Sequence, residues 1–281
     1  MSSLSPPALT SVVLCADDYA CNEAVSQGIV HLARLGRLSA TSVMTLSPHW
    51  MEHAPALREL QGAIDVGVHL DWTSAFAQEA GLSQGLGGVI WRSLRKGWNA
   101  SQVRVAIEHQ LDAFERVWQS PPDHVDGHQH IQQFDGFREV LGQILVERYG
   151  QQTTRPWVRI SQTQHAHFKG AFIAWMGANA LRVWAQAHQW PTLSPLLGVY
   201  GFDGTTSDYA RRMQGWLAES QACSQPALIM CHPALRGEAQ DAIGLARANE
   251  FQYLASDDFV AHLRVARVQL TRGSKTQTAT A

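Results

Sequence analysis

Apolar and polar positions alternate in blocks along this chain, and the blocks predict strands and helices in turn. Short apolar runs are typical of buried strands, and they occupy residues 11–16, 40–46, 64–70, 157–160 and 227–230. Between these runs, apolar residues recur every three or four positions, as they do on one face of a helix. Strands that alternate with helices predict an α/β fold with a mainly parallel sheet or barrel.

Helix boundaries are predicted most clearly at two points. Asn22 precedes a periodic apolar segment and can cap a helix, which Gly36 would end in a left-handed conformation. A second helix is predicted to begin at the N-cap Ser101 and to stop before Pro121, because proline cannot continue a helix. Its apolar stripe comprises Val103, Ile107, Leu111, Phe114 and Trp118.

Three segments depart from this pattern. Residues 74–98 are rich in Gly, Gln and Ser and are predicted to form a long surface loop. Residues 124–131 are predicted to be a strand of unusual polarity. The ends, 1–10 and 271–281, are predicted to be flexible, and residues 1–281 to form one domain because no shift in composition divides them.

Composition narrows the class of protein. Hydrophobic residues make up 45% of the 281 positions and charged residues 16%, which is typical of a globular chain with a large core. The net charge of −2, without any basic run, argues against nucleic acid as a partner. No apolar stretch is long enough for an integral membrane segment. Ten tryptophans leave a homodimer contact open.

Cysteine usage and the leader bear on location. Cys15, Cys21, Cys223 and Cys231 form no C-x-x-C pair, so neither a zinc knuckle nor a disulfide framework is indicated. The leader lacks the basic start of a signal peptide. We therefore expect reduced thiols in the cytoplasm.

The candidate chemistry lies where polar residues directly follow apolar strands. Active sites of parallel α/β folds lie at the carboxyl ends of their strands. Asp17 and Asp18 follow the first run, His69 ends the third and His232 follows the last. These side chains are therefore expected to meet at one end of the sheet.

The polar strand predicted at 124–131 adds a fourth group. In an extended segment, Asp126, His128 and His130 would share one face. Carboxylate oxygen and imidazole nitrogen are ligands of divalent metals, and three protein ligands leave a position open for water. A metal site is therefore predicted, with Asp126 orienting one of the nearby imidazoles.

Each feature alone has an ordinary structural explanation. An Asp-Asp pair commonly caps a helix, a lone histidine such as His69 can be a satisfied core residue, and His232 before a proline can belong to a turn. Trp72 lies near the predicted loop and could stack on a sugar ring, although core packing is the commoner use of tryptophan. The functional interpretation rests on the four groups together.

The four groups also resemble a known family. Residues 14–19 (Leu-Cys-Ala-Asp-Asp-Tyr), 67–70 (Gly-Val-His-Leu), 124–130 (His-Val-Asp-Gly-His-Gln-His) and 230–233 (Met-Cys-His-Pro) are similar to the signature blocks of the YdjC-like carbohydrate deacetylases, in the same order and at similar spacing. The resemblance extends from about residue 12 to the helices past residue 250.

The resemblance implies a TIM-like or NodB-like (β/α) barrel that removes acetyl groups from N-acetylated sugars, with one divalent ion, Mg²⁺ or Zn²⁺. It implies Asp18, His69 and His128 as metal ligands. It also implies Asp17 as general base and His232 as general acid. We further assign His130, Asp126 and Trp72 to substrate binding, and the substrate is an oligosaccharide or a glycolipid.

Departures from the family pattern surround the ligands without removing them. Cys15 replaces a common Asn, Tyr19 and Ala20 replace Phe-Gly, and Gly127 replaces Ser, which bears on substrate choice. Two alternatives stay open: a metal-dependent phosphoesterase or amidohydrolase, and a non-catalytic sugar-binding homologue. A phosphoesterase would need a second metal and several cations, which the four groups do not offer.

Overall fold

The computed structural model describes residues 9–82, 85–163 and 176–276. All strand pairs are parallel and follow the order β6-β5-β4-β3-β2-β1-β8-β7, with β9 added beside β1. The strands are β1 (Thr10–Tyr19), β2 (Ala40–Val43), β3 (Asp65–Leu70), β4 (His124–Gly127), β5 (Trp157–Arg159), β6 (Thr192–Leu193), β7 (Leu196–Leu197), β8 (Ala227–Cys231) and β9 (Val268–Leu270).

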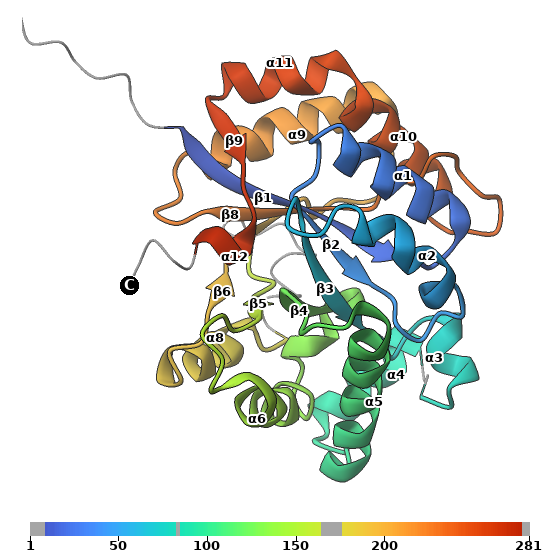
Figure 1. The fold of residues 1–281 in the computed structure, drawn as a ribbon, viewed down its shortest axis with the longest axis vertical. Coiled ribbons are helices and arrows are strands. Elements are labelled where there is room, and N and C mark those ends of the chain that lie inside the picture. Colours follow the sequence, from blue (N-terminus) through green and yellow to red (C-terminus); the bar gives the residue numbers. More distant parts are fainter. Residues whose placement is uncertain (1–8, 83–84, 164–175, 277–281) are drawn as a thin grey trace, which may run out of the picture.

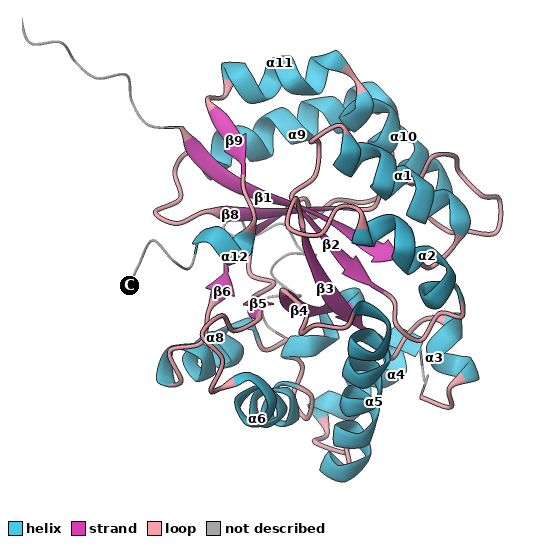
Figure 2. Ribbon diagram, viewed as in Figure 1, coloured by secondary structure: helices cyan, strands magenta, loops and turns pink. Residues whose placement is uncertain are grey.

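The sheet nearly closes into a barrel because one segment pairs on both sides. Residues 192–197 contain β6, which pairs with β5, and β7, which pairs with β8. Helices surround this sheet on its outside (Figures 1 and 2). The predicted (β/α) barrel with mainly parallel strands is therefore confirmed.

The helices fill the connections between strands. They are α1 (Glu23–Arg34), α2 (His49–Arg58), α3 (Ala75–Glu79), α4 (Gly85–Leu94), α5 (Ala100–Trp118), the 3-10 helix η1 (His128–Gln133), α6 (Arg138–Tyr149), α8 (Ala178–Ala187), α9 (Thr206–Ser220), α10 (Gly244–Ala255), α11 (Asp257–Val265) and α12 (Gly273–Thr276). None of the described helices is both long and apolar enough to cross a membrane.

The two faces of the sheet pack into different cores. In β1, Val12 and Leu14 belong to the large cluster that includes the surrounding helices. Val13 and Cys15 instead pack in a small cluster with Trp157 and other strand residues, as the alternation of strand side chains requires. Alternate strand residues therefore point into the barrel, and the small cluster is its apolar filling.

The interior of the barrel also constrains Gly67 in β3. A Cβ atom built on Gly67 would lie 2.4 Å from the His124 ring. That ring stacks on Trp157 with a centroid separation of 4.1 Å, so it has little room to move away. Only glycine fits at this position.

Sequence-based helix boundaries were right at one end of the chain and displaced elsewhere. The Asn22 side chain accepts from Val25 N, and Gly36 has a φ of +67°, as predicted. The N-cap of α5 is Asn99 rather than Ser101, because the Asn99 side chain accepts from Gln102 N. The predicted loop 74–98 was wrong, since it contains α3 and α4.

Parts of the predicted flexible ends are ordered. Thr10 already belongs to β1, and Gly273–Thr276 forms α12. The N–H and hydroxyl of Ser274 both donate to Asp65, at 2.8 and 2.6 Å. This segment therefore packs at the amino-terminal end of the barrel. Residues 1–8 and 277–281 lie outside the described residues.

Candidate active site

A cavity of about 410 Å³ lies at the carboxyl end of the barrel strands. Six of the predicted site residues line it: Asp17, Asp18, His69, His128, His130 and His232. Parallel strands end at the same edge of the sheet, which explains why groups far apart in the sequence meet there. The structure therefore brings the four sequence motifs together.

The last residues of β1 and the turn that follows hold Asp18 in place. Asp18 and Ala20 have φ angles of 67° and 71°, in the left-handed region that non-glycine residues rarely adopt. The hydroxyl of Ser26, in α1, accepts from Ala20 N at 3.1 Å and donates to Asn22 O, which fixes the turn. Such strained conformations persist where the surroundings hold them, and they are common at functional sites.

Asp18 and His69 face each other at a separation suited to shared metal ligation. Asp18 Oδ1 lies 3.4 Å from His69 Nε2 and is buried without a hydrogen-bond partner. Two ligands of one tetrahedral zinc, each bound at about 2.0–2.1 Å, lie about 3.3 Å apart. Burial opposes the charge of Asp18, but Arg247 and the neighbouring histidines together outweigh burial and keep the pKa of that carboxyl below its usual range.

Both predicted histidine ligands are oriented through Nδ1. His69 Nδ1 lies 2.6 Å from Asp126 Oδ1, and His128 Nδ1 lies 2.7 Å from Thr73 Oγ1. These contacts leave Nε2 of each ring for a ligand, as outer-shell partners of metal-binding histidines commonly do. Burial lowers the pKa of His69, but Asp126 together with Asp17 and Asp18 more than compensates and raises it to about 9, so a metal would bind Nε2 by displacing a proton.

Of the two roles expected of Asp126, its position is suited to orienting an imidazole rather than to contacting substrate. Its side chain is fully buried, does not line the cavity, accepts from Ser42 and His69, and forms an ion pair with Arg159. It lies beside His69 Nδ1 and away from the cavity, a position suited to orienting the His69 ring. The predicted alternation is also wrong beyond Gly127, because β4 ends there and η1 follows.

Asp17 is held by a buried arginine that the sequence motifs did not include. Arg159 donates to both carboxylate oxygens of Asp17, at 2.6 and 2.7 Å, and also contacts Asp126 Oδ2 at 2.6 Å. Burial raises the pKa of Asp17, but the Arg159 charge and hydrogen bonds outweigh that effect and lower it. Asp17 is therefore ionised at neutral pH and can accept a proton.

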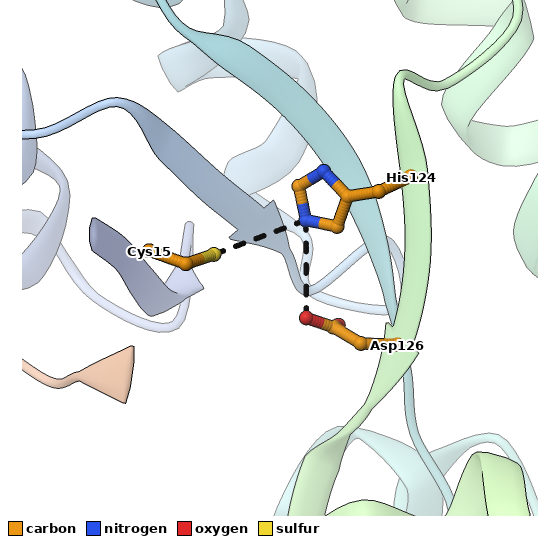
Figure 3. A group of neighbouring side chains, drawn as sticks. All are labelled: Cys15, His124 and Asp126. Carbon is orange, nitrogen blue, oxygen red and sulfur yellow. Dashed lines mark hydrogen bonds and ion pairs between the residues drawn. The ribbon is translucent and has the colours of Figure 1, made fainter. Parts of the chain in front are cut away.

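The position of Arg159 argues against a metal at two other groups of side chains that could bind one. Cys15, His124 and Asp126 point toward one another inside the barrel (Figure 3), and Asp17, His69 and Asp126 form a second compact group. The Arg159 Nη2 atom lies 3.2 Å from Cys15 Sγ and 2.6 Å from Asp126. Burial raises the pKa of the Cys15 thiol, so it stays protonated. A cation already neutralises both groups, which disfavours a metal there.

The predicted ligand set is more open than these two groups. The donor atoms of each compact group lie within 4.8 Å of one another. Those of Asp18, His69 and His128 are not all that close together. Unlike Cys15 and His124, however, they line the cavity, where a substrate can reach them. A ligand position open to substrate is characteristic of catalytic metal sites.

His232 lies beside the Asp17 carboxylate. Its Nε2 atom is 3.8 Å from Asp17 Oδ2, and its Nδ1 atom is buried without a partner. Its backbone N–H donates to Glu250, which also accepts from Tyr200. Burial lowers the pKa of His232 to about 4, so a general acid at this position must first receive a proton.

Comparisons with known proteins agree with the resemblance noted in the sequence. A family model described as YdjC-like protein matches residues 11–265. The chain belongs to the YdjC-like family.

Named relatives of this YdjC-like chain match part of it. It is 26% identical over 142 residues to a chitooligosaccharide deacetylase of Proteus mirabilis (strain HI4320), covering 49% of this chain and 56% of the relative. It is 27% identical over 143 residues to one of Enterobacter sp. (strain 638), with the same coverage. The chain therefore spans about half the length of the curated relatives it matches.

Solved structures agree with the YdjC-like fold. A candidate cellobiose-phosphate cleavage protein of Enterococcus faecalis V583 has a TM-score of 0.73 at 18% identity, covering 95% of this chain and 99% of that one. An uncharacterised protein of Agrobacterium tumefaciens C58 has a TM-score of 0.60 at 9% identity, covering 97% and 91%. At these identities the likeness concerns the fold.

The remaining predicted residues of the YdjC-like site fall in different places. His130 lines the cavity, with Nδ1 2.9 Å from Ser161 Oγ and a φ of 64°. Burial lowers the pKa of His130 to about 3, so it is neutral. Trp72 does not line the cavity: it is buried and packs edge-on against Phe137. Its predicted sugar contact is therefore corrected to core packing.

Proposed function

We propose that this YdjC-like protein is a metal-dependent hydrolase that removes an N-acetyl group from an amino sugar. The observation that carries the proposal is the Asp18 Oδ1 atom, which has no hydrogen-bond partner among the described residues and lies 3.4 Å from His69 Nε2, in a cavity that Asp17 also lines. The names of the partial-length relatives support the reaction class.

Asp18 and His69 are close enough to share a single divalent ion, Mg²⁺ or Zn²⁺, and His128, which lines the same cavity, would move closer to complete the ligand set. One carboxylate and two imidazoles suit zinc, and the buried unpartnered oxygen is a group that a cation would satisfy. When bound, such an ion polarises the amide carbonyl and lowers the pKa of water.

The other residues would move protons. Asp17, ionised and fixed by Arg159, accepts the proton of the attacking water as the amide carbon–oxygen bond forms. That proton passes to His232, whose Nε2 atom lies 3.8 Å from Asp17 Oδ2. His232 then protonates the sugar nitrogen as the carbon–nitrogen bond breaks. A neutral resting His232 suits this order, because it must first receive a proton.

The cavity wall favours a glycolipid over an oligosaccharide. Above the polar floor, the wall includes the aliphatic side chains of Leu86, Ile90, Met176 and Ile243. Sugar hydroxyl groups need hydrogen-bonding partners that these side chains lack. We therefore expect the amino sugar to carry an apolar group.

The alternative of a phosphoesterase finds less support. Among the described residues that line the cavity, Arg247 is the one with a Lys or Arg side chain. It is already bound to Asp18 and Asp241, so it is not available to neutralise a phosphate.

The four cysteines are free in the structure, in keeping with the cytoplasmic location expected from the sequence.

The decisive experiment measures acetate release with chelator, Mg²⁺ or Zn²⁺. N-acetylchitooligosaccharides would be compared with an alkyl glycoside of N-acetylglucosamine, and His128→Ala would serve as control. Metal-dependent release that the substitution abolishes would establish the reaction and the site. Faster release from the alkyl glycoside would support the apolar partner. Absence of release from both substrates, with metal bound at His128, would contradict deacetylation.

A further inference from the structure

Arg247, in α10, is bound to the carboxylate that is expected to ligate the metal. Its Nη2 atom donates to Asp18 Oδ2 at 2.7 Å, and its Nε atom donates to Asp241 Oδ2 at 2.6 Å. Only 6% of Arg247 is exposed, so both bonds are shielded from solvent. Two carboxylates thus fix the plane of the guanidinium, and the guanidinium in turn fixes Asp18.

The two oxygens of Asp18 have different surroundings. Oδ2 is occupied by Arg247, whereas Oδ1 has no partner and faces His69. A carboxylate can bind a metal through one oxygen or through both, and binding through both fills an additional coordination position. The structure leaves Oδ1 alone available.

We propose that Arg247 is a positioning residue that keeps Asp18 a one-oxygen metal ligand. This inference rests on the proposed function. Its consequence is that the metal retains open positions for water and for the amide oxygen of the substrate, as hydrolytic metal sites require. Arg247 would thereby set the coordination number through Asp18.

A purely structural role for Arg247 would give different results. The backbone carbonyl of Arg247 accepts from Ala234 N, and this bond would persist after side-chain substitution. The Nη1 contact to His232 O is long, at 3.4 Å. The side chain therefore acts mainly through Asp18 and Asp241, and its effect on coordination can be measured separately from its effect on stability.

The test uses the full chain loaded with Co²⁺, because the visible absorption of this ion weakens as its coordination number rises. In Arg247→Met, both oxygens of Asp18 can bind, and the absorption coefficient is expected to fall by about half. Turnover is expected to fall about 10-fold with little change in KM. Arg247→Lys, which can still donate to Oδ2, should recover most of both. Arg236→Met, an exposed arginine on the preceding loop, is the matched control.

The outcomes separate this inference from the proposed function. An unchanged cobalt spectrum in Arg247→Met, with Co²⁺ bound, would overturn the inference alone. If the wild-type protein bound no Co²⁺, or if Asp18→Asn left Co²⁺ binding unchanged, both the inference and the proposed function would be overturned. If Arg247→Met does not fold, Asp241→Asn removes one anchor of the guanidinium and is expected to shift the spectrum in the same direction. No shift in that variant would again refute the inference.

Discussion

Replacing Arg159 by methionine tests whether the stability of the folded protein depends on one buried charge at the centre of the barrel. Arg159 is fully buried and contacts Asp17 and Asp126, both of which are also buried. Removing one partner from a buried ion pair typically costs about 3–5 kcal/mol, because a charge is left without compensation. We expect Arg159→Met to lose at least that much, which corresponds to a melting temperature lower by about 6–15 °C.

The pH dependence gives the sharper test. Arg159 lowers the pKa of both carboxyl groups in the folded protein, against the opposing effect of burial. Groups whose folded pKa is depressed add stability above their unfolded pKa, and this stability is lost as pH falls through the folded pKa. The deficit of Arg159→Met should therefore be largest at neutral pH and shrink as the pH is lowered from about 5 toward 3.

The assay is urea denaturation at several pH values with chelator present. Arg148→Met is a suitable control, since Arg148 pairs with the carboxylates Asp112 and Glu115 nearer the surface and should contribute about 1 kcal/mol or less. Adding Asp17→Asn and Asp126→Asn to Arg159→Met removes the uncompensated charges and should recover much of the loss. A deficit below about 1 kcal/mol at pH 7, or one that grows toward acid pH, would refute the reasoning.

Three further predictions follow from single contacts. Gly67→Ala should lower the urea midpoint by the equivalent of about 1–3 kcal/mol, since the new Cβ would meet the His124 ring at 2.4 Å; an unchanged midpoint would contradict the packing described. Burial and the neighbouring Asp65 raise the pKa of Asp123 to about 6, so stability should fall as pH rises from about 4 to 6. Asp123→Asn should abolish that fall and raise the free energy of unfolding by about 1–2 kcal/mol at pH 7, measured by urea denaturation across this pH range. Equal stability of the two proteins at every pH would exclude the raised pKa of Asp123. Thr73→Val removes the hydroxyl beside His128 Nδ1 and should weaken zinc binding about 10-fold by calorimetry; unaltered affinity would show that Thr73 does not orient the ring.

The sequence predicted the cavity residues better than their supporting contacts. Residues that end strands can be located from an apolar run followed by a polar side chain, which is how Asp18, His69 and His232 were found. Arg159 and Ser161 also end a strand, but Arg159 lies inside a short apolar run, where an arginine reads as an interruption of the pattern. Only the pairing of β4 with β5 shows that it reaches Asp17 and Asp126.

Local backbone conformation and packing explain where the other sequence predictions differ from the structure. The motif from Asp126 to His130 has the alternation of a strand, yet Gln129 and His130 adopt left-handed angles of φ 55° and 64°. Period-two spacing cannot distinguish a continuing strand from such a turn, because both leave polar residues at alternate positions. Trp72 was misassigned for a related reason: its place in the sequence does not show that Phe137 packs against it.

The origin of the cavity wall has an evolutionary consequence. The floor residues that would perform the chemistry also hold the charges at the centre of the barrel, so most changes to them would cost stability. The aliphatic wall comes from elsewhere: Leu86 and Ile90 from α4, and Ile243 from the segment before α10. Substitutions in the wall residues could therefore change the substrate while the residues of the cavity floor stay the same. Among proteins with this fold, substrate range should diverge faster than reaction type.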